Sequence, residues 1–137
     1  MTDLDKTKRA VSESSELSKK GEHRAALRLL DEAITDAILT VDDASIRILT
    51  RHAAVISEHI GDLDLSRRYT EQSLPHSSED PFTWYSLANN LLRQGKGNLA
   101  RQYAAKSYTL SLKRGREEDK QLAQTIKKRW PDIIATK

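Results

Sequence analysis

Cysteine is absent from this chain of 137 residues, which excludes a disulfide framework and any zinc site built on thiolates. Proline and glycine are scarce, with three prolines and five glycines, so the regular elements must be long. No window approaches the run of about 18 apolar residues that a membrane-spanning helix needs. The segment from Met1 to Lys20 is polar almost throughout and does not resemble a signal peptide. We therefore expect a cytoplasmic protein with no membrane partner.

A large excess of charge of one sign is also missing. The formal net charge is +3, and acidic residues are interleaved with basic ones along most of the chain, which argues against binding driven by charge alone. Hydrophobic residues make up 37% of the chain and charged residues 31%. This balance suits a thin, elongated helical layer, which needs less core per residue than a sphere does. The length fits one domain or a short stack of repeats.

Residues of similar size and polarity recur at fixed distances from three glycines, Gly21, Gly61 and Gly95, and these distances define a repeat register. The recurring residues are Ala26, Ser66 and Ala100 (five after the glycine), Leu29, Tyr69 and Tyr103 (eight after), Ala33, Ser73 and Ser107 (twelve after), and Ser14, Ala54 and Ala88 (seven before). These offsets are multiples of a helical turn on either side of a break, so they predict pairs of amphipathic helices that meet at a glycine corner. Small residues at fixed places let the two helices of a pair cross closely.

A helix pair with this pattern and a spacing of 34 residues, as from Gly61 to Gly95, resembles the tetratricopeptide repeat family. In the third repeat the family's aromatic, leucine and small-residue positions fall on Trp84, Leu87 and Ala88. The two earlier repeats match less well, and the resemblance covers roughly residues 7 to 114. From Gly21 to Gly61 the spacing is 40, with six extra residues most easily placed around 39–44.

The predicted fold is all-α, with helices at about 5–20, 22–39, 43–59, 63–74, 81–94, 98–114 and 116–129. Thr2 or Asp3 is available to cap the first helix, and Asp80 followed by Pro81 marks the start of the fifth. The resemblance implies a right-handed superhelical stack of three antiparallel helix pairs, at about 7–40, 47–80 and 81–114. A capping helix at about 116–129, with a polar outer face, would complete a single domain over 1–137.

In the tetratricopeptide family the first helices of successive pairs line a concave groove. The matching positions here are Lys8, Val11, Ser15, Ser18 and Lys19, then Ile48, Arg51, Val55, Glu58 and His59, then Phe82, Tyr85, Asn89, Leu92 and Arg93. The resemblance implies that Asn89 forms hydrogen bonds to the backbone of a bound peptide. A side-chain amide suits this role because it offers both donors and an acceptor. We predict that the peptide-binding groove consists of Arg51, Val55, Phe82, Tyr85, Asn89, Leu92 and Arg93.

The sequence leaves the occupant of part of this groove undecided and argues against one type of ligand. Phe82, Leu92 and Val55 would form an apolar patch, which either binds a partner or is covered by the chain's own first helix or by a second copy. One subgroup of the family clamps the carboxylate of a chaperone tail with Lys, Asn and Arg. The matching positions here hold Val11, Ser15, His52, Phe82 and Ser86, so we do not expect that clamp.

Sites of other kinds are poorly supported by the sequence. His52 and His59 lie seven apart without a third ligand, so we interpret them as solvated or capping histidines and expect no metal site. No catalytic grouping or phosphate loop stands out, so neither an enzyme nor a cofactor is expected. The basic clusters Lys113-Arg114-Gly115-Arg116 and Lys127-Lys128-Arg129 could contact nucleic acid or an acidic partner. We favour a solvated surface, because Glu117, Glu118 and Asp119 interrupt them.

The sequence thus favours a module that binds another protein or a peptide in a concave groove, as an adaptor, a chaperone-like holder or a regulatory subunit. A homo-oligomeric scaffold built from the same repeats is the first alternative. RNA binding by a helical-repeat surface is a weaker one, since the small-residue pattern around Trp84 and Ala88 differs from the polar code of such repeats.

Overall fold

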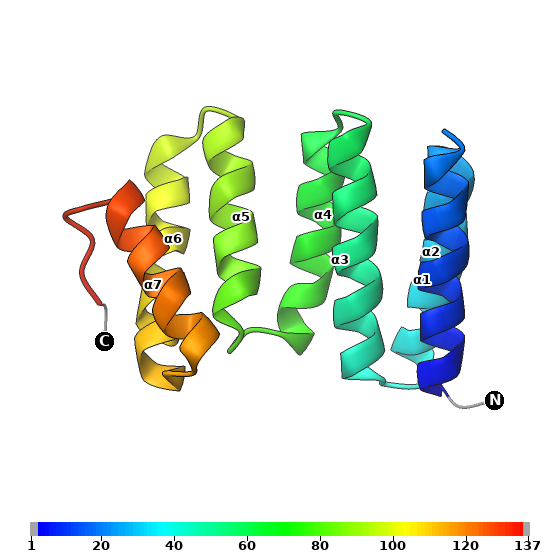
Figure 1. Cartoon of the computed structure of the whole chain (residues 1–137), viewed down its shortest axis with the longest axis horizontal. Coiled ribbons are helices and arrows are strands. Elements are labelled where there is room, and N and C mark those ends of the chain that lie inside the picture. Colours follow the sequence, from blue (N-terminus) through cyan, green and yellow to red (C-terminus); the bar gives the residue numbers. More distant parts are fainter. Residues whose placement is uncertain (1–2, 136–137) are drawn as a thin grey trace. The chain divides into compact units, whose positions relative to one another are not determined.

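The computed structural model describes residues 3–135. Over that range the chain forms seven α-helices and one short 3-10 helix, with no strand (Figure 1). The helices are α1 (Asp3–Lys19), α2 (His23–Leu39), α3 (Asp43–His59), α4 (Leu63–Ser73), η1 (Leu74–His76), α5 (Pro81–Arg93), α6 (Gly97–Arg114) and α7 (Glu117–Arg129). The predicted all-α class is confirmed. The cap predicted at Thr2 or Asp3 lies outside the described side chains.

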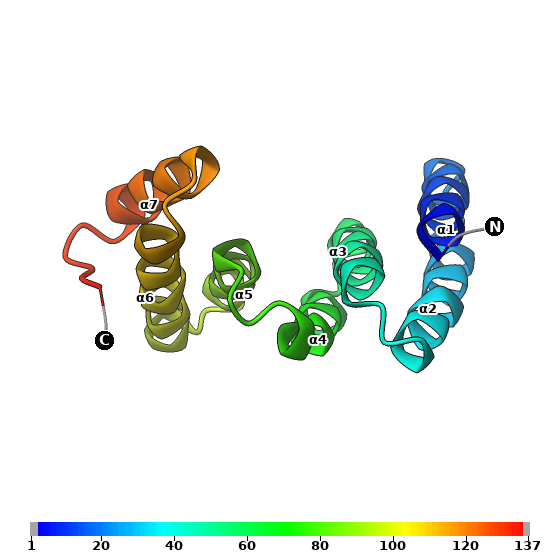
Figure 2. The ribbon, with the colours of Figure 1, turned by 90° about the horizontal axis from the view of Figure 1, so that it is seen from below.

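The chain divides into two compact units between His76 and Ser77. In the N-terminal unit α1 and α3 lie in one layer and α2 and α4 in the other (Figure 2), and α3 packs against the other three helices. In the C-terminal unit α5 and α6 form an antiparallel pair, and α7 packs against α6. The superhelical stack and the single domain over 1–137 stay predictions.

The small residues of the register lie where helices meet. Ala26, Ser66 and Ala100 are at most 2% exposed, and Ser14 and Ala88 are fully buried. The buried Ser107 hydroxyl donates to the carbonyl of Pro81 across the α5–α6 pair at 2.7 Å. A larger side chain at these positions would force the paired helices apart, because interiors are close-packed.

Four helix corners share one hydrogen-bond pattern. At Gly21, Gly61 and Gly95 the backbone φ is 80–82°, and two amides after the helix donate back to its last turn. The corner between α2 and α3 repeats this pattern with Val41, where φ is 52°. The Val41 amide donates to the carbonyl of Ile38 at 3.1 Å, and the Asp42 amide donates to that of Ala37 at 2.9 Å. A β-branched residue in this left-handed conformation is strained, since its Cβ crowds the backbone.

The six extra residues between the first two glycines are helical. α2 has 17 residues where α4 has 11, and α3 has 17 where α5 has 13. The two helices are together ten residues longer, because the six extra residues are accompanied by a shorter connection, 40–42 between α2 and α3 against 74–80 between α4 and α5. Within residues 3–135 no helix is both long enough and apolar enough to cross a bilayer.

Candidate protein-binding surface

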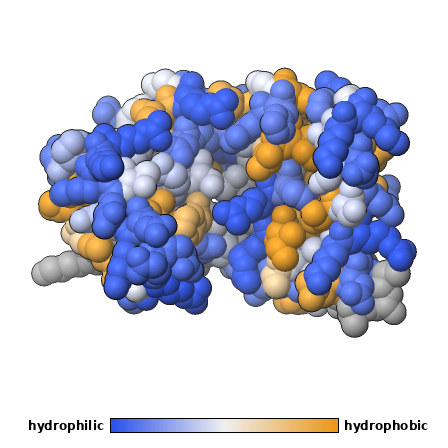
Figure 3. All heavy atoms as spheres, viewed as in Figure 1, coloured by the Kyte–Doolittle hydropathy of each residue, from blue (hydrophilic) through white to orange (hydrophobic). Residues whose placement is uncertain are grey.

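The outer face of α3 carries an exposed stripe of two apolar residues with an arginine between them. Ile48 is 42% exposed and Val55 45%, and they lie two helical turns apart with exposed Arg51 between them. The opposite side of α3 is buried through Leu49, Ala53 and other core residues. Figure 3 shows hydrophobic atoms gathered over α3 on this face. We call Ile48, Arg51 and Val55 the α3 stripe.

Contacts at its N-terminus fix the rotation of α3. Asp42 caps the helix: its carboxylate accepts from the Ser45 amide at 3.1 Å and from the Ser45 hydroxyl at 2.7 Å. The Ser45 hydroxyl, followed by its amide, lowers the pKa of Asp42 below the usual value. The Thr7 hydroxyl of α1 donates to the Ser45 hydroxyl at 2.6 Å, which ties α1 to α3. With the helix held in this way, the stripe must face outward.

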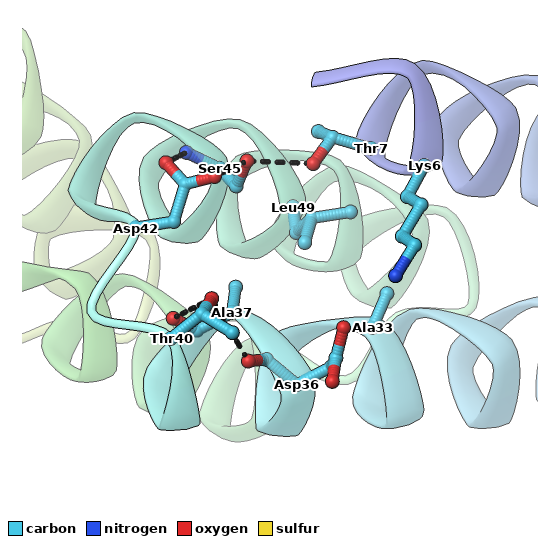
Figure 4. Close-up of a pocket in the computed structure, with 9 residues that line it drawn as sticks. All are labelled: Lys6, Thr7, Ala33, Asp36, Ala37, Thr40, Asp42, Ser45 and Leu49. Carbon is cyan, nitrogen blue, oxygen red and sulfur yellow. Dashed lines mark hydrogen bonds between the residues drawn. The ribbon is translucent and has the colours of Figure 1, made fainter. Parts of the chain in front are cut away.

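A small cavity lies beside this cap (Figure 4). It has a volume of about 40 Å³ and is bordered by residues of α1, α2 and α3, including Lys6, Thr7, Asp36 and Leu49. That volume has room for a few water molecules at most. The cavity is therefore a packing feature of the α3 cap.

The groove positions predicted on α1 contribute unequally to this surface. Val11 packs against the core of the N-terminal unit, and the Ser18 hydroxyl bonds to the ring of His23 at 2.9 Å. Lys19 is exposed and lies 3.6 Å from Glu16. On the same layer α3 presents more apolar surface than α1 does.

The expectation of a solvated or capping histidine is wrong for His52. Its Nε2 is buried and has no hydrogen-bond partner among the described residues, and burial lowers the pKa of His52 below its usual value. The reason is its place in the helix: His52 lies three residues after Leu49 and four before Ile56, on the buried side of α3. His59 is exposed in the last turn of α3, as expected.

In the C-terminal unit the predicted groove residues Phe82, Tyr85 and Leu92 lie against one cluster and are half-buried. They pack against a cluster formed by Ala88, Ala104, Leu122, Ile126, Trp130 and Ile133. The apolar patch at Phe82 and Leu92 is thus partly covered by a cluster that includes side chains of the chain's own last helix, which was not among the three expected occupants: a partner, the first helix or a second copy. Val55, the third member of the patch, is exposed on α3.

Asn89, the first candidate for peptide binding, is also engaged by the C-terminal segment. Arg129 at the end of α7 donates from Nη1 to the Asn89 side-chain oxygen. The same guanidinium lies over the Trp130 ring, 5.7 Å from its centroid. A peptide that bonds to the Asn89 side-chain oxygen would have to share it with Arg129 or displace Arg129. Arg93, the last predicted groove residue, is exposed.

One ion pair in the C-terminal unit escaped the sequence analysis. Asp119, which the sequence predicts to be a surface acid, is fully buried and accepts two hydrogen bonds from Arg114, at 2.8 and 2.7 Å. It also accepts from the Arg116 amide at 3.1 Å and so caps α7. The Arg114 side chain, followed by the Arg116 amide, lowers the pKa of Asp119 against the opposing effect of burial. The three-residue spacing from Arg116 to Asp119 is the signal that could have revealed this cap.

Neither a metal site in the described part of the chain nor a known relative identifies a function for this chain. Among residues 3–135 no three His, Asp or Glu side chains are placed to hold a metal ion. A scan against protein-family models and a search of curated proteins gave no match for this chain.

Proposed function

We propose that the chain is a helical-repeat protein of the tetratricopeptide type that binds a segment of another protein on the outer face of α3. The α3 stripe is the observation that carries this proposal. Apolar side chains exposed together on one helix face are typical of interaction sites, and arginine is enriched at the centres of such interfaces. A cytoplasmic adaptor or regulatory role, expected from the sequence, belongs to the same proposal.

The stripe also indicates what the bound segment looks like. Ile48 and Val55 are seven residues apart, which corresponds to about 10 Å along a helix. Arg51 lies between them and offers a fork of donors to a carboxylate. We infer a segment with two apolar side chains at that separation and an acidic residue between them.

The test compares three forms of the full chain in nuclease-treated lysate. Wild type is compared with an α3 variant, Ile48→Ser, Arg51→Ala, Val55→Ser, and with a control, Leu112→Ser, Lys113→Ala. The control also loses exposed apolar and basic side chains, but from α6. All three should show the same helicity by circular dichroism, because every substituted side chain is exposed.

The proposal requires one protein that is retained by wild type and control and lost by the α3 variant. A photo-crosslinker at Val55 should then label that protein, and one at Leu112 should not. Equal recovery by all three forms would reject the stripe. Recovery of the chain alone would move the homo-oligomeric scaffold ahead of adaptor binding.

A further inference from the structure

Charge is divided unevenly between the two units. Residues 77–137 contain 12 Lys and Arg against 6 Asp and Glu, a net charge of +6, whereas residues 1–76 contain 11 against 14, a net charge of −3. No acidic residue occurs from Pro81 to Arg116, or from Lys120 to Pro131. The small net charge of the whole chain therefore conceals a basic C-terminal unit.

Half of the acidic residues in the C-terminal unit are already bound to two arginines. Asp119 and Asp80 lie against Arg114, at 2.7 and 3.8 Å, and Asp132 lies 2.6 Å from Arg101. Asp132 also interacts electrostatically with Lys127, whereas Lys120, Lys128 and Arg129 of α7 form no ion pair with a carboxylate among residues 3–135. The positive charge of this unit is therefore not cancelled locally.

The outer face of α7 concentrates this uncompensated charge. After its first turn the exposed side chains of the helix are all basic or neutral polar, and we call them the basic α7 face: Lys120, Gln121, Gln124, Thr125, Lys127, Lys128 and Arg129. The apolar side chains of α7, such as Leu122 and Ile126, face the core. A helix C-terminus favours cations, but Lys120 lies in the first half of the helix, where the dipole does not favour it.

One cation of this face is held in place before any ligand binds. The Arg129 guanidinium is fixed by the Asn89 side chain and by the Trp130 ring. Its other donors remain available, and a preorganised arginine loses less conformational entropy on binding an anion. Lys127 is similarly held, since its Nζ donates to the carbonyl of Ile133 at 2.6 Å.

The chemistry of the face distinguishes between classes of polyanion. Protein interfaces have an apolar centre and are depleted in lysine, and the basic α7 face has several lysines and no apolar side chain. Lys, Arg, Gln and Thr side chains are those that contact phosphate oxygens and sugars along nucleic acids. We propose that the basic α7 face binds the sugar–phosphate backbone of a nucleic acid, without reading its base sequence. This site is independent of the α3 stripe.

The experiment measures how the full-length chain binds labelled nucleic acid over a range of salt concentrations. The probes are a short single-stranded RNA and a DNA duplex of equal length, followed by fluorescence anisotropy, with a polyglutamate peptide as competitor. The test variant is Lys120→Gln, Lys128→Gln. The control is Arg24→Gln, Arg28→Gln, which removes two exposed cations from α2 in the N-terminal unit.

We expect the affinity of wild type to fall with salt, with the same slope in the control. In the test variant the slope of log affinity against log salt should become shallower, by about 0.7 for each lysine on single strands and about 0.9 on duplex. The probe bound more tightly identifies RNA or DNA as the source of the backbone. Three results would overturn the proposal: no binding at low salt, an equal loss in the control, or displacement by polyglutamate at equal charge concentration, which would indicate an acidic protein.

Discussion

The same register positions have different surroundings in the two units. Ile48 and Arg51 of α3 lie thirteen and ten residues before Gly61, and Phe82 and Tyr85 of α5 lie at the same distances before Gly95. The α3 pair is exposed, whereas the α5 pair is half-buried against a cluster that includes α7 side chains. The exposure of a side chain at a given register position therefore depends on which other helices pack against it. A surface that is open on α3 is partly covered in the C-terminal unit.

The largest expected effect comes from removing side-chain volume in the cluster of α6, α7 and α5 residues against which Phe82, Tyr85 and Leu92 pack. Ile126 is fully buried in the cluster that includes Trp130, so Ile126→Ala should lower the free energy of unfolding by about 2–5 kcal/mol. Thermal unfolding followed by circular dichroism measures the loss. Binding of a hydrophobic dye should rise as Phe82 and Leu92 become exposed. If the dye signal and the stability both stay at wild-type levels, α7 does not cover this face.

An intermediate effect is expected at the corner of the N-terminal unit that has no glycine. A left-handed conformation costs a residue other than glycine about 1–2 kcal/mol, and glycine's greater freedom in the unfolded chain offsets part of the gain. Val41→Gly should therefore stabilise the protein by about 1 kcal/mol, measured by urea unfolding. Val41 is 74% exposed, so little packing is lost.

The reciprocal control for this corner is Gly61→Ala. A Cβ added at Gly61 would meet no atom within 4 Å, so any destabilisation comes from its φ of 80° alone. A Val41→Gly variant that unfolds more easily than wild type would show that the Val41 side chain makes a stabilising contact.

The smallest expected effect concerns the buried histidine of α3. Burial holds the pKa of His52 below its unfolded value, so the unfolded chain binds the proton more readily. Its contribution to stability is therefore complete above a pH of about 6.5 and is lost as the pH falls through the lower folded-state pKa. His52→Leu should raise the melting temperature by an amount corresponding to about 1 kcal/mol, because an unpaired buried nitrogen is removed.

The pH dependence separates this explanation from simple packing. Wild type should lose more stability than His52→Leu between pH 7.5 and pH 5.5, since only wild type can protonate this site (roughly one unit either side of a pKa near 6.5). Parallel losses in the two proteins would assign the pH dependence to other groups.

Local chemistry was sufficient to predict the helices. Every predicted helix boundary falls within two residues of the structure, and the glycine corners and the Asp80 cap with Pro81 are the clearest of the signals, because they act within a turn of the chain. The candidate site was harder to predict. That the C-terminal segment reaches α5 depends on contacts between distant residues such as Arg129 and Asn89, which no repeat position encodes. Val41 adopts the geometry of a glycine corner without a glycine, so its residue type gave no signal.

The shared corner pattern also bears on how the chain folds. Each corner closes through amide–carbonyl bonds between residues three and five apart, and loops this short close in less than about 100 ns. Three of the four corners can form early as local structures, because glycine adopts the required φ without strain. The strained φ of the Val41 corner has no such local preference, so we expect this corner to form only when α3 packs on α1 and α2. We therefore expect the pair of α1 and α2 to join the N-terminal unit late in folding and to be the first part of that unit to open in the native state.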